Sequence, residues 1–242
     1  MLRIAALLLL FSLLSACGSG DDGGSSEIKL ASARNYNAAG VWDNSSQEPD
    51  YQLLALIDEQ SHAVFYILDE VMFQCPLLID RDRFTCIPAT NYEISGVIDE
   101  EEKLTGAISN GNNVIYEFQL DYLDESDNNV RLESFVASWQ KESDGYTQTI
   151  TIDEDGDFTG SDTQGCVING SIEYISPNVN VQSVKFTNSN CDLAGTFYGK
   201  GTIVPNTDTD TDEPAPLRWK LLASSGDWYL NSILTKQTPE EP

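Results

Sequence analysis

The chain has 242 residues, of which 39 are acidic and 13 are basic, and its formal net charge is −26. A field of that sign repels DNA, RNA and anionic lipid head groups, which excludes a nucleic-acid-binding role. The charge is compatible with divalent cations, with a basic protein partner, or with solubility in a salty habitat. The single histidine, His62, is too little for a histidine-based triad or a multi-histidine metal site, and its place at the start of a strand-like run predicts a surface position.

The N-terminus has the layout of a secretory signal, because Arg3 precedes an apolar run at residues 4–14. That run is shorter than the roughly 20 apolar residues that a transmembrane helix needs. It ends in Leu14-Ser15-Ala16-Cys17, which resembles the lipobox of bacterial lipoproteins. An ordinary signal peptide that happens to precede a cysteine is the alternative.

The lipoprotein resemblance implies that residues 1–16 are removed and that Cys17 carries a diacylglycerol and an acylated amino group. Two or more acyl chains make a durable membrane anchor. Residues 17–36 then comprise the lipidated cysteine and a flexible tether, since residues 18–26 are only Gly, Ser and Asp. By the same resemblance, Gly18 in place of an aspartate favours the outer membrane, with the protein facing the periplasm or the cell surface.

Gly40-Val41-Trp42 is the first motif beyond the tether. It is similar to the Gly-x-Trp with which lipocalins open their barrel. The resemblance implies that Trp42 closes the floor of a barrel and that a late basic residue, here Arg218, covers it. Trp42 as an ordinary core aromatic on any first strand is the alternative.

Alternation of apolar and polar residues dominates the rest of the chain, and helical periodicity is almost absent. Short turns rich in Gly, Asn and Asp separate the alternating runs. This pattern predicts a single all-β domain at residues 37–235, with a disordered tail at residues 236–242. We expect an antiparallel meander of about 10–12 strands closed as a β-barrel, or alternatively a β-sandwich. The expected strands are residues 51–57, 63–68, 92–98, 104–108, 114–122, 131–139, 146–152, 167–175, 181–187, 196–204, 217–223 and 228–234.

Four cysteines remain beyond the lipobox, and an even number in an exported chain predicts disulfide bonds. Folding the first intervening segment about its middle, Asp80-Arg81, sets Cys75 opposite Cys86. Folding the second about its middle likewise sets Cys166 opposite Cys191. Opposed residues of an antiparallel pair have Cα atoms about 4.5–5.5 Å apart, which a disulfide spans. We therefore expect these two disulfides. A thiolate metal site is the alternative, although no Cys-x-x-Cys spacing supports it.

The best local cluster of carboxylates supplies four candidate Ca²⁺ ligands: Asp153, Asp155, Asp157 and Asp162. Its spacing is not that of an EF-hand, and a plain acidic hairpin turn is the alternative. Residues 94–106 and 150–160 share the order of a strand, an acidic turn and an apolar-Thr-Gly sequence. This similarity indicates one hairpin pattern used twice.

The sequence contains no nucleophile elbow, phosphate-binding glycine loop or metalloprotease helix, so we expect no enzymatic activity and no cofactor apart from Ca²⁺ at the acidic loop. The export signal with its lipobox and the expected β-barrel together predict a lipid-anchored envelope lipoprotein that binds a small apolar ligand or a protein partner. Tyr116, Phe118 and Trp139 are the residues expected to line a ligand cavity. The alternative is an envelope or surface protein with a structural or interaction role and no small ligand, assisted by Ca²⁺ or inhibiting a basic enzyme such as lysozyme.

Overall fold

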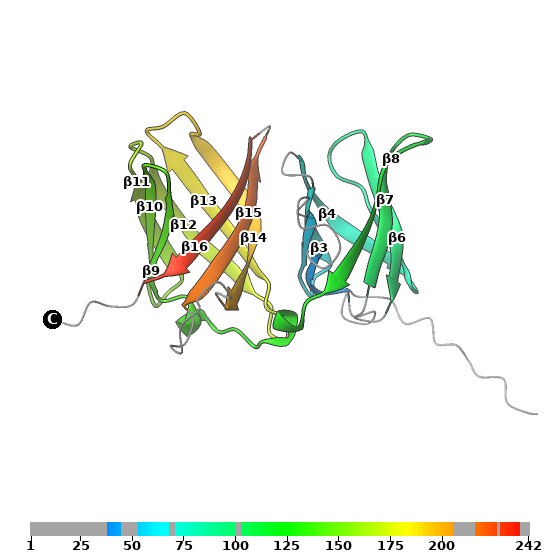
Figure 1. The fold of residues 1–242 in the computed structure, drawn as a ribbon, viewed down its shortest axis with the longest axis horizontal. Coiled ribbons are helices and arrows are strands. Elements are labelled where there is room, and N and C mark those ends of the chain that lie inside the picture. Colours follow the sequence, from blue (N-terminus) through cyan, green and yellow to red (C-terminus); the bar gives the residue numbers. More distant parts are fainter. Residues whose placement is uncertain are drawn as a thin grey trace, which may run out of the picture. The chain divides into compact units, whose positions relative to one another are not determined.

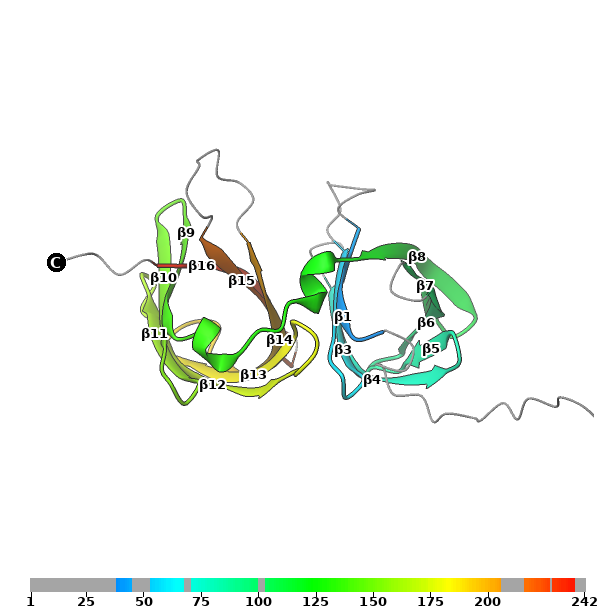
Figure 2. The ribbon, with the colours of Figure 1, turned by 90° about the horizontal axis from the view of Figure 1, so that it is seen from below.

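The computed structural model describes residues 38–44, 53–67, 71–99, 103–205, 216–226 and 228–237. Within these ranges the chain forms two closed antiparallel β-barrels of eight strands each. Figure 2 shows each barrel as a ring of strands. The expected all-β barrel fold is therefore confirmed. The range predicted as one domain lies within one compact unit of the chain, but it holds two barrels where one was expected.

The strands of each barrel follow the ring in chain order (Figure 1). The first barrel consists of β1 (Gly40–Asp43), β2 (Leu53–Ile57), β3 (His62–Ile67), β4 (Val71–Asp80), β5 (Arg83–Cys86), β6 (Tyr92–Asp99), β7 (Lys103–Asn110) and β8 (Asn113–Tyr122). The second consists of β9 (Ala137–Ser143), β10 (Tyr146–Ile152), β11 (Asp157–Asp162), β12 (Val167–Ile175), β13 (Gln182–Ser189), β14 (Gly195–Pro205), β15 (Leu217–Ser225) and β16 (Trp228–Lys236). Two short 3-10 helices, η2 (Asp124–Asp127) and η3 (Leu132–Ser134), connect β8 to β9 in the sequence.

Two small barrels bury the inward side chains better than one large barrel would. Eight strands enclose an interior that side chains can fill, whereas about sixteen enclose an aqueous channel. In the first barrel the ring of Phe65 lies 6.3 Å from that of Phe84 and 6.1 Å from that of Phe118, measured between centroids. In the second barrel Trp219 lies 6.0 Å from Trp139. Aromatic rings from different strands therefore pack together in the interior of each barrel.

Three strands were not among those expected from the sequence, β4, β5 and β11, and β1 was expected only as a first strand that carries Trp42. The region of β4 and β5 was recognised only as a cysteine hairpin, and β11 was interpreted as part of an acidic loop. The expected strand at residues 131–139 begins instead as η3 and becomes extended only at Ala137. Lys236 belongs to β16 and not to the C-terminal tail.

Both expected disulfides, Cys75–Cys86 and Cys166–Cys191, are present, with Cα atoms 5.6 and 4.9 Å apart. The register of the first hairpin differs from the expected one, because Leu77 lies opposite Cys86. The turn falls one residue later than its expected middle, where Arg81 adopts the left-handed conformation with φ of 59°. The disulfide therefore joins diagonal neighbours, which are still close enough to bond.

The two barrels begin in the same way. Trp42 in β1 and Trp139 in β9 are both fully buried. The indole Nε1 of Trp42 donates a hydrogen bond to the carbonyl oxygen of Ala38 at 2.9 Å. That of Trp139 donates to the carbonyl oxygen of Phe135 at 2.7 Å, again four residues earlier. The tryptophan therefore fixes the incoming chain against the first strand in both barrels.

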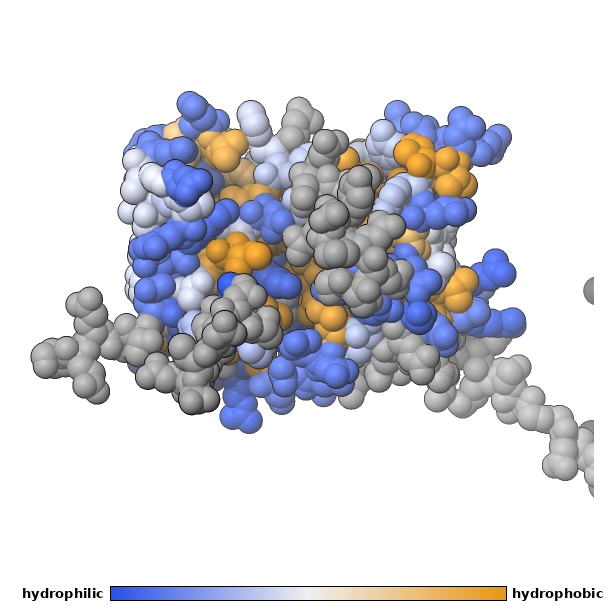
Figure 3. Space-filling model, viewed as in Figure 1, coloured by the Kyte–Doolittle hydropathy of each residue, from blue (hydrophilic) through white to orange (hydrophobic). Residues whose placement is uncertain are grey.

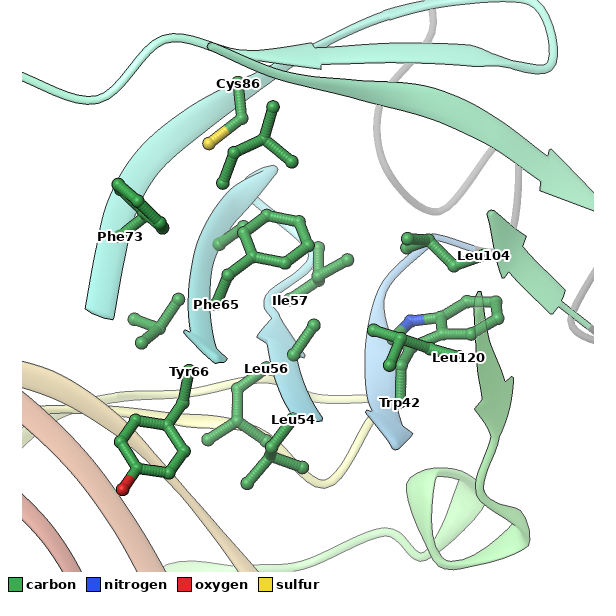
Figure 4. Close-up of a cluster of buried hydrophobic side chains, with 14 of the residues drawn as sticks. Trp42, Leu54, Leu56, Ile57, Phe65, Tyr66, Phe73, Cys86, Leu104 and Leu120 are labelled. Atoms are coloured by element: carbon green, nitrogen blue, oxygen red, sulfur yellow. The ribbon is translucent and has the colours of Figure 1, made fainter. Parts of the chain in front are cut away.

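The first barrel is buried on part of its outer face as well. Figure 4 shows Phe65 on one side of β2 and β3 and Leu54, Leu56 and Tyr66 on the other. All four side chains are buried, and Leu222 of β15 belongs to the same apolar cluster. The outer face of β2 and β3 is thus covered by apolar side chains of the second barrel.

Candidate ligand-binding site

A cavity of about 570 Å³ adjoins β8 of the first barrel. Ligand pockets of proteins commonly measure roughly 300–1,000 Å³. Tyr116 and Phe118, two of the three residues expected to line a cavity, are among its lining residues. The other described lining residues are Asn44, Leu53, Ser95, Thr105, Gly106, Ala107, Glu117 and Gln119.

The cavity reaches the edge of β8. Successive side chains of a strand point to opposite faces, yet residues 116–119 all line this one space. Among the described residues, β1 pairs with β8 only through Trp42 and Asp43, which lie opposite Tyr122 and Asp121. Residues 116–119 lie beyond this short seam. One cavity therefore contacts both faces of the strand.

Small residues on β7 leave room for the cavity. Gly106 and Ala107 line it, and a Cβ atom placed on Gly106 would lie only 2.8 Å from Cζ of Phe118. The Phe118 ring therefore packs directly against the glycine. A larger residue at this position would clash with this ring and, at the same 2.8 Å, with the backbone oxygen of Ser95.

The lining of the cavity combines aromatic and polar groups. Asn44 is held at its margin by its Oδ1 atom, which accepts a hydrogen bond from the backbone N–H of Leu53 at 2.8 Å. Glu117 is the only residue with a formal charge at neutral pH among the described lining residues, and none of them is Lys, Arg or His. The site can therefore offer apolar contact, hydrogen bonds and one negative charge.

Trp139, the third residue expected to line a cavity, is not brought to this one. It belongs to β9 of the second barrel and is fully buried. The interior of that barrel holds a void of only about 10 Å³, lined by residues such as Phe158, Phe186 and Leu221. A space of that size holds about one water molecule. Large aromatic side chains have filled the second barrel, and Trp139 is one of them.

The arrangement expected for Trp42 occurs at Trp139 instead. Arg218, expected to cover Trp42, belongs to β15 of the second barrel. Lys236, in the last strand of that barrel, has its Nζ atom 5.8 Å from the ring centroid of Trp139. The same ammonium donates a hydrogen bond to the carbonyl oxygen of Ser134 at 2.8 Å. A late basic residue thus covers the tryptophan of the second barrel.

The four candidate Ca²⁺ ligands do not converge. Asp157 begins β11 and Asp162 ends it. Oδ1 of Asp153 accepts hydrogen bonds from the backbone N–H groups of Asp155 and Asp157, both at 3.0 Å, and so closes the hairpin turn. In the described part of the chain no group of three or more His, Cys, Asp or Glu side chains could hold a metal ion. The carboxylate of Asp153 has a structural role in an acidic hairpin.

The turn closed by Asp153 recurs at two other hairpins that the sequence analysis did not single out, while the turn within residues 94–106 lies partly outside the described residues. Oδ1 of Asp58 accepts from the backbone N–H groups of Gln60 and His62. Oδ1 of Asp162 accepts in the same way from those of Gln164 and Cys166. An aspartate whose carboxylate binds the N–H groups two and four residues later is therefore the shared hairpin element of this protein.

The structure contains a buried ion pair that no pattern in the sequence predicted. Lys200 Nζ lies 2.5 Å from Asp58 Oδ2, and the two side chains are 6% and 1% exposed. Lys200 also donates a hydrogen bond to Oγ of Ser183 at 3.0 Å. Burial lowers the pKa of Lys200, and the adjacent Asp58 carboxylate partly offsets this effect. His62 is exposed, as expected, and its Nδ1 lies 3.8 Å from Asp58 Oδ2.

Comparisons with known proteins identify no relative. No protein-family model matches the sequence, and neither a curated protein nor a solved structure matches it significantly. Across the described ranges, none of the helices has the length and apolar character needed to cross a membrane. Cys17 and the rest of residues 1–37 lie outside the described residues.

Proposed function

We propose that this chain is a lipid-anchored lipoprotein of the outer membrane whose first barrel binds a small, partly apolar ligand without catalysing a reaction. The difference between the two barrels carries the proposal. The second barrel has an interior void of about 10 Å³, whereas the first has a cavity of about 570 Å³. A pocket of this volume lies within the size range of ligand sites, and its lining combines aromatic with polar groups. These properties suit a small, partly apolar ligand.

Two further observations support the proposed localisation at the outer membrane. Leu14-Ser15-Ala16-Cys17 resembles a lipobox, and the two disulfides are of the kind that persists in oxidising compartments outside the cytoplasm.

On the face shown in Figure 3, hydrophilic residues lie between the apolar ones. Large continuous apolar patches mark protein interfaces, so the interrupted apolar surface of this one face favours a small ligand over an extended apolar partner.

Native mass spectrometry of the full-length protein, extracted from membranes in mild detergent, tests the proposal. We expect a population that carries an additional small-molecule mass and loses it on activation. The variant Tyr116→Ala removes an aromatic side chain from the cavity and should lose the adduct. The matched control Tyr229→Ala removes an exposed tyrosine from β16, outside the cavity, and should keep it.

A protein that stays without an adduct when incubated with a total envelope extract contradicts the ligand-binding role. In that case the alternative of a partner-binding protein without a small ligand takes precedence. The lipid anchor is tested separately with the variant Cys17→Ser. This variant should lose the acyl masses, and acyl masses that persist in it would refute Cys17 as the lipidated residue.

A further inference from the structure

The hairpin of β7 and β8 presents two neighbouring aliphatic side chains to solvent. The register of the two strands shifts between Ile108 and Ser109, so that Ile115 is an extra residue in β8. An extra residue of this kind is a β-bulge, which re-aims the side chains beside it. Val114 is 58% exposed and Ile115 is 56% exposed. The bulge therefore keeps two consecutive side chains on the solvent side, where a regular strand would turn one of them inward.

Glu93 and Glu117 lie on the same outer face as these two side chains. Glu117 follows Ile115 by two residues in β8, and side chains two residues apart in a strand share a face. Glu93 lies opposite Ser109, which in turn lies opposite Val114. Both glutamates are exposed. The residue of β7 opposite each of them is uncharged, so neither carboxylate faces a cation on that strand.

Ile87 extends this surface toward β5. It follows Cys86, which lies opposite Ile94 of β6, and it is therefore next to Glu93. Its side chain is 59% exposed. Three aliphatic side chains and two carboxylates thus form what is named here the hairpin surface: Ile87, Glu93, Val114, Ile115 and Glu117. Of these five, Glu117 alone also lines the cavity.

The charge of the chain and the chemistry of the hairpin surface indicate what covers it. A net charge of −26 repels a second copy of this chain and anionic lipid head groups, and it attracts basic proteins. Lys and Arg side chains combine a long apolar stem with a cationic head. On the hairpin surface the stem can lie along Val114 and Ile115 while the head meets Glu93 or Glu117. An apolar centre with a polar rim is also the usual arrangement of a protein interface.

We propose that the hairpin surface docks a basic protein partner, which presents Lys or Arg side chains to it. The aliphatic residues contact the partner's apolar stems, and Glu93 and Glu117 pair with its cationic heads. This inference goes beyond the ligand-binding role of the first barrel and does not depend on it.

Site-specific photo-crosslinking in the cells that produce the protein tests the proposal. The photoreactive residue p-benzoylphenylalanine replaces Asn112 of the full-length chain, an exposed residue at the tip of the hairpin that leaves the hairpin surface intact. A second protein carries it in place of Gln164, an exposed turn residue of the second barrel. We expect a crosslinked protein from position 112 and not from position 164. Mass spectrometry should identify a partner with more Lys and Arg than Asp and Glu.

Variants of the protein that carries the probe at position 112 separate the aliphatic contacts from the charges. Val114→Ser/Ile115→Ser removes two buried aliphatic contacts and should lower the yield of the crosslink about tenfold or more. Glu93→Gln/Glu117→Gln removes two ion pairs at the rim and should lower it about threefold or more. The matched control Glu133→Gln/Glu154→Gln makes the same change in net charge at exposed residues outside the hairpin surface and should leave the yield unchanged.

Four results would overturn the inference: no crosslinked protein, an acidic partner, a crosslink to a second copy of the chain, or equal yields from the two probe positions. Equal losses from the two glutamine variants would overturn it as well, because the general field of the protein and not the hairpin surface would then attract the partner. The adduct measured by native mass spectrometry is independent of these outcomes, so the failure of one proposal leaves the other standing.

Discussion

Replacing Lys200 with methionine should destabilise the protein strongly. Lys200 contributes one half of an ion pair whose side chains are only 6% and 1% exposed. The methionine keeps most of the side-chain volume but leaves the carboxylate of Asp58 buried without its cation. Removing one partner of a buried pair typically costs about 3–5 kcal/mol of folding free energy.

We expect the loss of folding free energy to lie at the lower end of that range, because the Asp58 carboxylate keeps other hydrogen bonds. Oδ1 of Asp58 still accepts hydrogen bonds from the backbone N–H groups of Gln60 at 2.9 Å and His62 at 2.8 Å. These two donors partly offset the cost of burying the Asp58 carboxylate without its cation. We therefore expect a loss of about 3 kcal/mol, which for a domain of this size corresponds to roughly 6–12 °C in the midpoint of thermal unfolding.

A double-mutant cycle isolates the pair from the rest of the site. Asp58→Asn keeps an oxygen for the two backbone donors but leaves the Lys200 ammonium buried. The double variant Lys200→Met/Asp58→Asn removes both charges and should recover most of the stability. Urea unfolding followed by tryptophan fluorescence measures all four proteins. Losses that simply add in the double variant would refute the view that Lys200 and Asp58 stabilise the fold as a pair.

The single variant Asp58→Asn should also depend on pH with a definite sign. Burial already lowers the pKa of Lys200 from its ordinary value of 10.5, and loss of the carboxylate should lower it further. The unfolded chain then binds more protons than the folded chain at every pH between the lowered pKa and about 10.5. The stability of this variant should therefore rise with pH across that window.

Three further predictions concern the second barrel. Burial and the neighbouring Asp162 raise the pKa of Tyr146 to about 12, so the folded protein should lose stability as the pH rises from 10 to about 12, and Tyr146→Phe should flatten that dependence in alkaline unfolding experiments. Serine substitution of both Cys166 and Cys191, which close 25 residues, should cost about 3 kcal/mol by thermal unfolding, slightly more than removal of the shorter disulfide. Gly170→Ala would press a Cβ against the backbone oxygen of Lys185 and Cβ of Phe186 as well as the ring of Phe158, and should cost about 1–3 kcal/mol by urea unfolding, whereas a neutral effect would mean that β12 and β13 can move apart locally.

The elements that sequence analysis found correctly are those determined by neighbouring residues. Residues 114–122 alternate between apolar and polar side chains, and they lie within β8. The disulfides were paired correctly, because each hairpin brings its own two cysteines together whether or not the register is shifted by two residues. The acidic turn at Asp153 was also recognisable as a hairpin turn, because the aspartate and the backbone groups that it binds are within four residues of each other.

Errors arose where local signals conflict with packing. Residues 157–162 are polar enough to suggest a loop, yet they form β11, because Phe158 faces the core and its neighbours need only face solvent. The expected strand at residues 131–139 begins as η3. Here Phe135 caps the interior of the second barrel, and its ring lies 5.9 Å from that of Trp219.

Residues close together in the chain specify the all-β character, most of the strands and the two disulfides, and these features were therefore predictable from the sequence. Three features appear only in the folded molecule: the chain closes two barrels, the cavity adjoins β8 while aromatic side chains fill the second barrel, and Lys200 meets Asp58. These features depend on which strands become neighbours around each ring. Period-two alternation states which side chains face inward, but it does not state how many strands share that interior or which side chains meet across it.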